Sequence, residues 1–205
     1  MPDPVEDVVE LTDPKAIRAI AHPARLIVID ALYDQGLELT ATQAAELAGT
    51  SPSAMSYHLR ALEKFGVVRR AGARDDARER PWVRVARDLR IRTPTPGTSR
   101  ATTIATGAVL TTAMDIARAR LLAVLERGIG DGSARLPLDD VAGYAHTSVL
   151  VTPAEARALL VAMNELLEPV LAEVRTDPPD DAGRMTFVLA SIPDPDVRGP
   201  RPRKR

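Results

Sequence analysis

The segment Thr40–Val68 reads TATQAAELAGTSPSAMSYHLRALEKFGVV and carries two helix signals in close succession. The first helix begins at Thr40 and is small and apolar as far as Gly49, which ends it. Ser51 and Pro52 then supply a capping hydroxyl and a proline for the first helical position, a strong helix start. Gly66 closes this second helix. Two short helices joined by a tight glycine turn are the helix-turn-helix pattern.

The second helix, residues 51–65, is predicted to have two chemically different faces. A period of 3.6 residues places Met55, Leu59 and Leu62 on one buried stripe. The opposite face carries hydroxyl, phenol, guanidinium and ammonium groups, which suit phosphate oxygens and base edges in a DNA major groove. The solvated side of an ordinary amphipathic helix is the alternative interpretation. The residues predicted to contact DNA from this helix are Ser51, Ser53, Ser56, Tyr57, Arg60 and Lys64.

A hairpin is expected next, with strands over 67–71 and 82–86 and a polar tip over 72–80. Its arginines, among them Arg74, Arg78 and Arg80, are predicted to contact DNA, because such a tip can follow a backbone or enter a minor groove. Acidic neighbours that neutralise these arginines are the alternative. Trp82 is expected to pack the hairpin onto the helices.

Charge is distributed unevenly along the 205 residues. Residues 51–92 hold 11 basic and 5 acidic side chains, whereas residues 1–50 hold 3 basic and 9 acidic ones. Residues 101–196 are again acidic, with 7 basic and 14 acidic side chains. This segregation suggests a polyanionic partner for the basic segment, with an arginine-rich solvated surface as the alternative.

Two further helices are expected upstream, one starting at Asp13-Pro14 and one running from Pro23 to Tyr33. His22 lies at the break between them and is expected to be structural. His58 falls beside the buried stripe of helix 51–65, so we expect a packed or hydrogen-bonded imidazole. The three histidines are scattered and the chain has no cysteine, so no metal site is predicted.

Residues 13–88 resemble the winged helix-turn-helix of ArsR-like transcriptional regulators. The resemblance rests on AIAHPAR at 19–25, AAELAGTSPS at 44–53 and AMSYHLRALEKFGVV at 54–68. It implies a DNA-binding homodimer, usually a repressor released by a signal. By this resemblance, DNA-reading positions are occupied by Ser53, Ser56, Tyr57 and Arg60.

The chain departs from metal-sensing members of that family just before the first helix of the pair. Those members typically have a cysteine-containing motif there, whereas this chain has ELTATQ at 38–43. Hydroxyls do not replace the soft thiolates that arsenic(III), cadmium or lead require. Metal sensing is therefore not expected.

The second half is predicted to dimerise the protein through its long helix; packing of that helix only on a later helix over 153–174 and a strand over 185–192 is the alternative. A helix over 102–127 carries an apolar stripe that includes Leu110, Met114 and Leu121. A strand over 146–151, a helix starting at Thr152 and a strand over 185–192 are expected to form a small α/β subdomain. That subdomain is expected either to hold an unidentified small-molecule effector or only to brace the dimer.

The predicted fold is mainly α with a β-wing: a winged helix-turn-helix followed by a helical, small α+β dimerisation region. With no membrane-length apolar run and an acidic start, a cytoplasmic protein without membrane association is expected. No catalytic motif is apparent, so neither an enzyme nor a cofactor is predicted.

The expected function is a repressor that binds a palindromic operator as a homodimer; a winged helix that docks protein instead is the alternative. The predicted divisions are a disordered start at 1–12, the DNA-binding domain at 13–92, a linker at 93–100, the dimerisation region at 101–192 and a disordered basic tail at 193–205.

Overall fold

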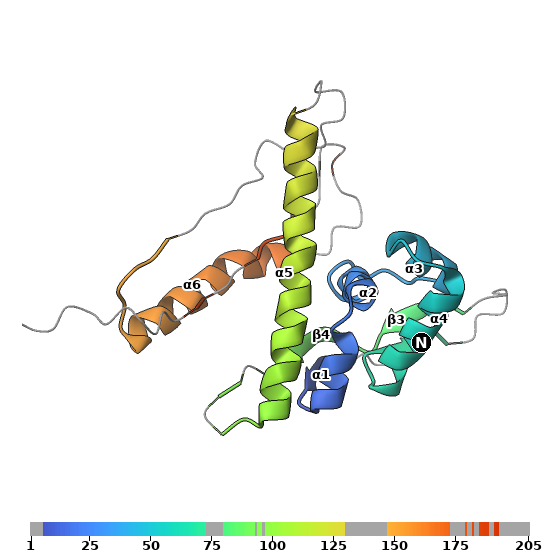
Figure 1. Cartoon of the computed structure of the whole chain (residues 1–205), viewed down its shortest axis with the longest axis horizontal. Helices are drawn as coiled ribbons and strands as arrows, with labels where there is room; N and C mark the ends of the chain where they lie inside the picture. Colours follow the sequence, from blue (N-terminus) through green and yellow to red (C-terminus); the bar gives the residue numbers. More distant parts are fainter. Residues whose placement is uncertain are drawn as a thin grey trace, which may run out of the picture. The chain divides into compact units, whose positions relative to one another are not determined.

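A computed structural model describes residues 6–72, 80–92, 94–95, 97–129 and 147–172, with short stretches at 179, 182, 185–188 and 191–192. The chain divides into two compact units, Met1–Arg118 and Ala119–Arg205 (Figure 1). The first unit contains the helix-turn-helix region.

The first unit contains four short helices. Asp13, His22 and Ser51 each cap a helix by accepting a backbone N–H, and a proline follows each cap. Thr40 and Gln43 form a reciprocal capping box at the start of the remaining helix. These starts confirm the predicted helices. Their bounds are α1 Pro14–Ile20, α2 Pro23–Tyr33, α3 Ala41–Leu47 and α4 Pro52–Lys64.

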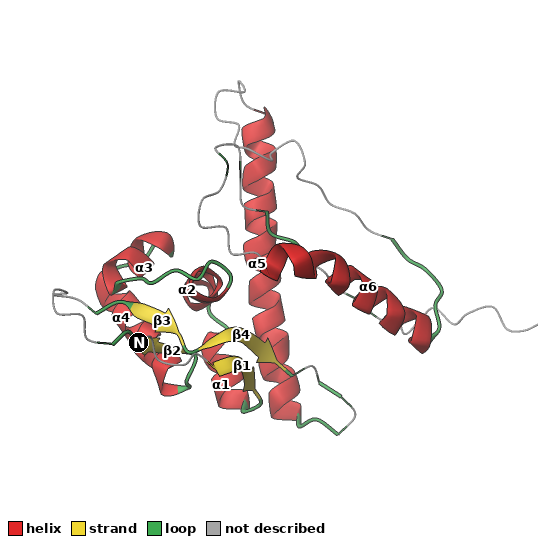
Figure 2. Ribbon diagram, turned by 180° about the vertical axis from the view of Figure 1, so that it is seen from behind, coloured by secondary structure: helices red, strands yellow, loops and turns green. Residues whose placement is uncertain are grey.

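The predicted hairpin is present. β2 (Val68–Arg70) pairs antiparallel with β3 (Trp82–Arg84), as Figure 2 shows. The Trp82 side chain is 1% exposed and belongs to the hydrophobic core, which confirms its predicted packing role. The helix-turn-helix therefore carries a small β-wing.

The prediction of a disordered start at 1–12 was wrong for residues 6–11. Glu6–Leu11 form β1, which pairs in parallel with β4 (Ala86–Ile91). Parallel strands need a long connection, and here it is the whole segment between them, including all four short helices. Glu10 and Arg92 add a two-bonded ion pair, with N–O distances of 2.9 Å at both contacts. The partner strand lies so far along the chain that the local pattern of β1 does not reveal it.

One hydrophobic core holds the first unit together. Its largest fully buried side chains come from α1, α2, α4 and the wing: Ile17, Ile20, Val28, Leu32, Met55, Leu59, Leu62, Val67, Val68 and Trp82. Tyr33 donates its hydroxyl to the Val67 carbonyl at 2.5 Å, and Arg84 donates to the Tyr33 carbonyl at 2.8 Å. These bonds join α2 to the wing across the core.

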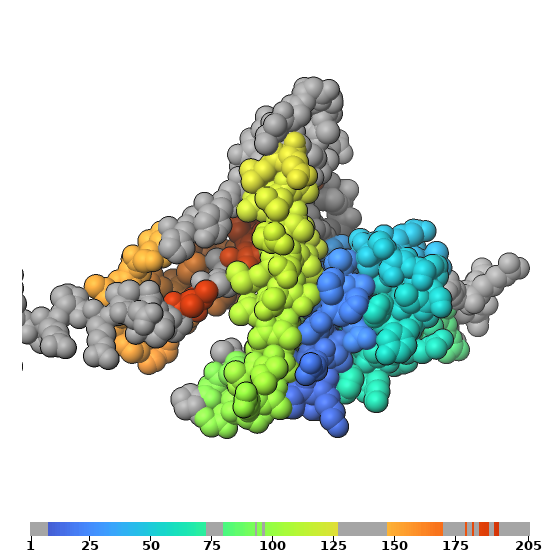
Figure 3. All heavy atoms as spheres, viewed as in Figure 1, coloured from blue at the N-terminus to red at the C-terminus, as the bar shows by residue number. Residues whose placement is uncertain are grey.

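The long helix α5 (Arg100–Ile129) confirms the helix predicted over 102–127. Ala105 and Val109 are buried in the core of the first unit, so the first part of α5 lies against α1 and α2 (Figure 3). Leu110 and Met114, from the predicted stripe, are 54% and 41% exposed. The face of α5 that packs on the core is therefore a different one from the predicted stripe.

In the second unit, the predicted capped helix is present as α6 (Pro153–Ala172). The Thr152 hydroxyl accepts the Glu155 N–H at 3.2 Å, and the Glu155 carboxylate accepts the Thr152 N–H at 2.7 Å. Pro169 lies inside α6, and helical structure runs on to Ala172. Within the described residues, no helix is long and apolar enough to cross a membrane.

The prediction of strands over 146–151 and 185–192 was wrong for the residues of these segments that the structure describes. Residues 147–151, 185–188 and 191–192 are irregular. β-Branched and apolar residues form a strand only where another strand supplies hydrogen-bond partners, and none is described beside these segments. His146 and the basic tail at 193–205 lie outside the described residues.

Candidate nucleic-acid interface

The turn between α3 and α4 is set by Gly49. Its φ of 61° lies in the left-handed region, which a residue without a Cβ adopts at little cost. The Gly49 N–H bonds to the Glu46 carbonyl at 3.2 Å and the Thr50 N–H bonds to the Ala45 carbonyl at 2.9 Å, so the end of α3 is closed. The chain then enters α4 after a single turn.

A buried stripe anchors α4 and determines which side faces outward. Met55, Leu59 and Leu62 are all 0% exposed, as the sequence predicted. Anchoring by three fully buried side chains leaves the helix little freedom to rotate about its axis.

The structure places five of the six residues predicted from this helix at exposed positions. The Tyr57 side chain is 66% exposed. Ser56 is half-buried on the flank. The first turn of α4 holds no acidic residue, so the positive end of the helix dipole is not neutralised there. The exposed members of the set, besides Tyr57, are Ser51, Ser53, Arg60 and Lys64.

The base of the wing places further guanidinium groups beside the helix-turn-helix. The Arg70 guanidinium lies 4.0 Å from the centre of the Trp82 ring and donates to the Arg80 carbonyl at 2.5 Å. Arg80 is exposed at the point where the chain returns from the tip. Two other predicted wing contacts, Arg74 and Arg78, lie outside the described residues.

His58 is hydrogen-bonded, as predicted, and its partner comes from α2. The Arg25 Nε–H donates to His58 Nδ1 at 3.2 Å, and the His22 and His58 rings lie 4.4 Å apart. Burial, with added effects from His22 and Arg25, lowers the pKa of His58 below its ordinary value. His22 itself caps α2 by accepting the Ala24 N–H, which confirms its structural role. The link to Arg25 was not predicted, because nothing local relates residues 33 positions apart.

The segment at 38–43 has a structural use. The Thr40 hydroxyl accepts the Gln43 N–H at 3.2 Å and so caps α3. In the part of the chain that the structure describes, no group of three or more histidine or acidic side chains is placed to hold a metal ion.

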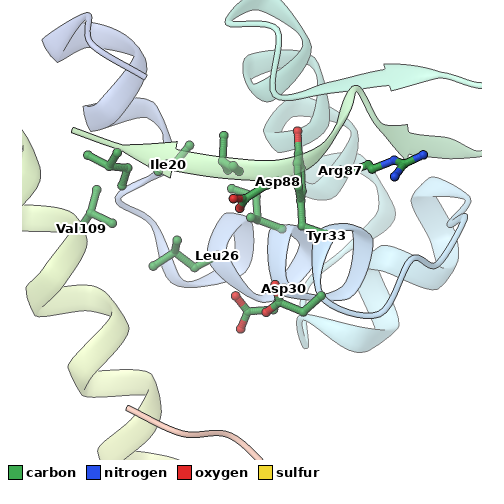
Figure 4. A pocket seen from close by; sticks show the side chains of 11 residues that line it. Ile20, Leu26, Asp30, Tyr33, Arg87, Asp88 and Val109 are labelled. Atoms are coloured by element: carbon green, nitrogen blue, oxygen red, sulfur yellow. The ribbon is translucent and has the colours of Figure 1, made fainter. Parts of the chain in front are cut away.

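A small open cavity of about 220 Å³ lies in the first unit, between α2, β4 and α5 (Figure 4). Apolar side chains from these elements, such as Leu26, Ile29 and Val109, line part of it. Asp30, Arg87 and Asp88 add charged groups of both signs. The residues predicted to contact DNA do not line this cavity.

Residues 20–71 match a family model described as a helix-turn-helix domain. The match covers the region from the end of α1 through α4 to β2. No curated protein matches the chain. The chain therefore contains a helix-turn-helix domain, and this finding supports DNA binding and a role in transcription regulation.

Proposed function

We propose that this protein is a sequence-specific transcriptional repressor that binds a palindromic DNA operator as a homodimer. In this proposal α4 enters the major groove, and the arginine-rich wing at 67–87 lies on the backbone or in the minor groove. The observation that carries the proposal is the outer side of α4. Its hydroxyl, phenol, guanidinium and ammonium groups project from a helix whose other side is fully buried.

The side chains on that surface divide naturally into two roles. Arg60 is exposed and carries the planar fork of donors that matches the O6 and N7 acceptors of guanine. Lys64, at the end of the helix, suits a phosphate oxygen, which contributes affinity without sequence information. The helix-turn-helix match supports this use of α4, because such a domain docks its second helix on base edges.

The apolar stripe of α5 supports the homodimer. Leu110 and Met114 remain largely exposed in the single chain, although α5 already buries Ala105 and Val109 in the core. A second copy of the same helix would cover this stripe through a two-fold interface. Two copies of α4 would then read half-sites about one DNA turn, or ~34 Å, apart. Bound across a promoter, such a dimer would block transcription by occupancy alone, without catalysis or a cofactor.

The proposal is tested by binding to double-stranded DNA. A duplex is first selected from a random-sequence pool with the purified full chain, and its affinity is compared with that of a scrambled duplex at two salt concentrations. Affinity for both duplexes should fall steeply as salt rises, because phosphate contacts release counterions. The selected duplex should remain the tighter ligand at both salt concentrations.

Arg60→Ala tests the reading role directly. It should weaken binding to the selected duplex by about 1–3 kcal/mol and reduce the preference over the scrambled one. Lys64→Ala is the matched control and should weaken binding to both duplexes by a similar factor. Enrichment of no sequence by the wild-type chain would contradict the proposed function. Unchanged selectivity in Arg60→Ala would contradict only the assignment of Arg60.

A further inference from the structure

Two sequence segments that are far apart along the chain meet at one side of α4. The first is the start of α2, where the N-cap His22 and Arg25 of the first turn lie. The second is the middle of α4, which contributes Tyr57 and His58. Their meeting point is not part of the buried core, because Arg25 and His58 are half-buried and His22 is exposed.

Arg25 is the centre of this cluster, because its guanidinium contacts three groups. Its Nε–H donates to His58 Nδ1 at 3.2 Å, and its Nη1 donates to the carbonyl of Ala19, near the end of α1, at 2.5 Å. Its Cζ also lies 6.0 Å from the centre of the Tyr57 ring, at the outer limit of a cation–π contact. One rigid, planar group thus connects α1, α2 and α4.

The bond to His58 specifies the state of that imidazole. A guanidinium has only donors, so Nδ1 must be the unprotonated nitrogen and the proton of the neutral ring must lie on Nε2. His58 also contacts two other rings: its ring centre lies 4.4 Å from that of His22 and 5.9 Å from that of Tyr57, which it meets edge-on. The residue that follows the exposed Tyr57 therefore has a side chain held in place by these contacts.

We propose that Arg25 is a positioning residue for DNA reading, which holds the His58 and Tyr57 side chains against the end of α1 and so fixes how Tyr57 projects from the outer side of α4. This inference rests on the proposed function. Arg25 is assigned no base contact; it acts through the geometry of α4. Its loss should therefore reduce discrimination between DNA sequences more than it reduces affinity for DNA in general.

Lysine at position 25 is the informative replacement. It keeps the positive charge and hence the long-range attraction to phosphates. An ammonium lacks the fixed fork geometry, however, and cannot reach the Ala19 carbonyl and His58 Nδ1 with the same pair of in-plane donors. Arg18→Lys, at an exposed position on α1, is the matched control for the same chemical change.

The first measurement uses the full chain without DNA. The ¹⁵N shifts of the His58 imidazole should show an unprotonated Nδ1 and a protonated Nε2 in the wild-type chain and in Arg18→Lys. In Arg25→Lys they should move toward the average of the two tautomers. Wild-type shifts in Arg25→Lys would overturn the proposed link.

The second measurement compares the selected duplex with the scrambled duplex. Arg25→Lys should lose about tenfold in selectivity, the size of a modest base-reading defect, while its affinity for the scrambled duplex stays within about twofold. His58→Leu should show the same loss. His58→Asn should retain most of the selectivity, because the Asn side-chain oxygen can accept from Arg25 in place of Nδ1.

The possible failures are distinguishable. If the wild-type chain selects a sequence and Arg25→Lys discriminates equally well, the positioning role is wrong and the proposed function stands. Equal losses in Arg18→Lys and Arg25→Lys would overturn the positioning role, because they would reflect a general effect of replacing arginine. If the wild-type chain selects no sequence, the proposed function fails and the positioning role fails with it.

Discussion

The imidazole of His58 makes stability depend on pH at the scale of a single residue. Its pKa in the folded protein lies below the ordinary value of 6.5, first because of burial and then because of His22 and Arg25. Between those two values the unfolded chain binds more protons than the folded one. The folded state is therefore stabilised above the ordinary value, and this stabilisation disappears as the pH falls through the lowered pKa.

We predict that replacing His58 by Asn reduces this pH dependence, because Asn does not titrate. Urea unfolding followed by circular dichroism, at about pH 7.5 and about pH 5.5, measures the effect. The wild-type chain should lose more unfolding free energy between the two conditions than His58→Asn does. Equal losses in both proteins would show that the environment of His58 is the same in the folded and unfolded chains.

At the scale of an element, the α3–α4 turn depends on the backbone of Gly49. No other atom lies within 4 Å of the position a Cβ would take there, so the cost of a side chain is conformational and not steric. Gly49→Ala should lower the free energy of unfolding by about 1–2 kcal/mol, the cost of a left-handed conformation for alanine. Gly72→Ala is the control: it has equally open surroundings and no positive φ, and its change should be small. Equal unfolding free energies for both variants would contradict this account of the turn.

The pairing of β1 with β4 is expected to weaken in acid. The hydrogen-bonded Arg92 guanidinium holds the pKa of the Glu10 carboxyl below its ordinary value of 4.5. The ion pair therefore contributes fully above that value and is lost as the pH falls through the lowered pKa. In Glu10→Gln, the stability of this pairing should depend less on pH than in the wild-type chain. The effect should be small, since both groups are exposed, and acid titration of amide NMR signals in β1 measures it.

The elements that the sequence predicted well are those whose signals are local. Each short helix begins at a capping side chain followed by proline or within a capping box, so its start depends on neighbouring residues only. The two faces of α4 likewise follow from the helical period, and Met55, Leu59 and Leu62 are buried as the period requires.

The features that the sequence did not predict depend on distant partners. β1 forms because β4, which follows the helix-turn-helix in the sequence, supplies its hydrogen-bond partners. The segments at 147–151 and 185–188 have the composition of strands but gain no described partner, and they remain irregular. At the candidate interface, the exposure of Tyr57 and Arg60 follows from periodicity, whereas the bond from Arg25 to His58 appears only after folding.

At the scale of the whole molecule, the proposed homodimer predicts a role for the outer stripe of α5. Leu110→Asp combined with Met114→Asp places two carboxylates in the proposed dimer interface and should convert a dimer into a monomer. Sedimentation equilibrium on the full chain measures the change. Asp115→Ser, an exposed replacement on the same helix and off the stripe, should leave the assembly unchanged. A wild-type chain that sediments as a monomer at all concentrations would contradict the homodimer.

The burial of Trp82 gives the wing an optical signal of its own. It is the single tryptophan of the chain, it is 1% exposed, and the Arg70 guanidinium lies over its ring. Emission excited at the red edge of the indole band therefore comes from the root of the hairpin alone. Any event that separates the hairpin from the helices will shift that emission to the longer wavelengths of hydrated indole, with no label attached.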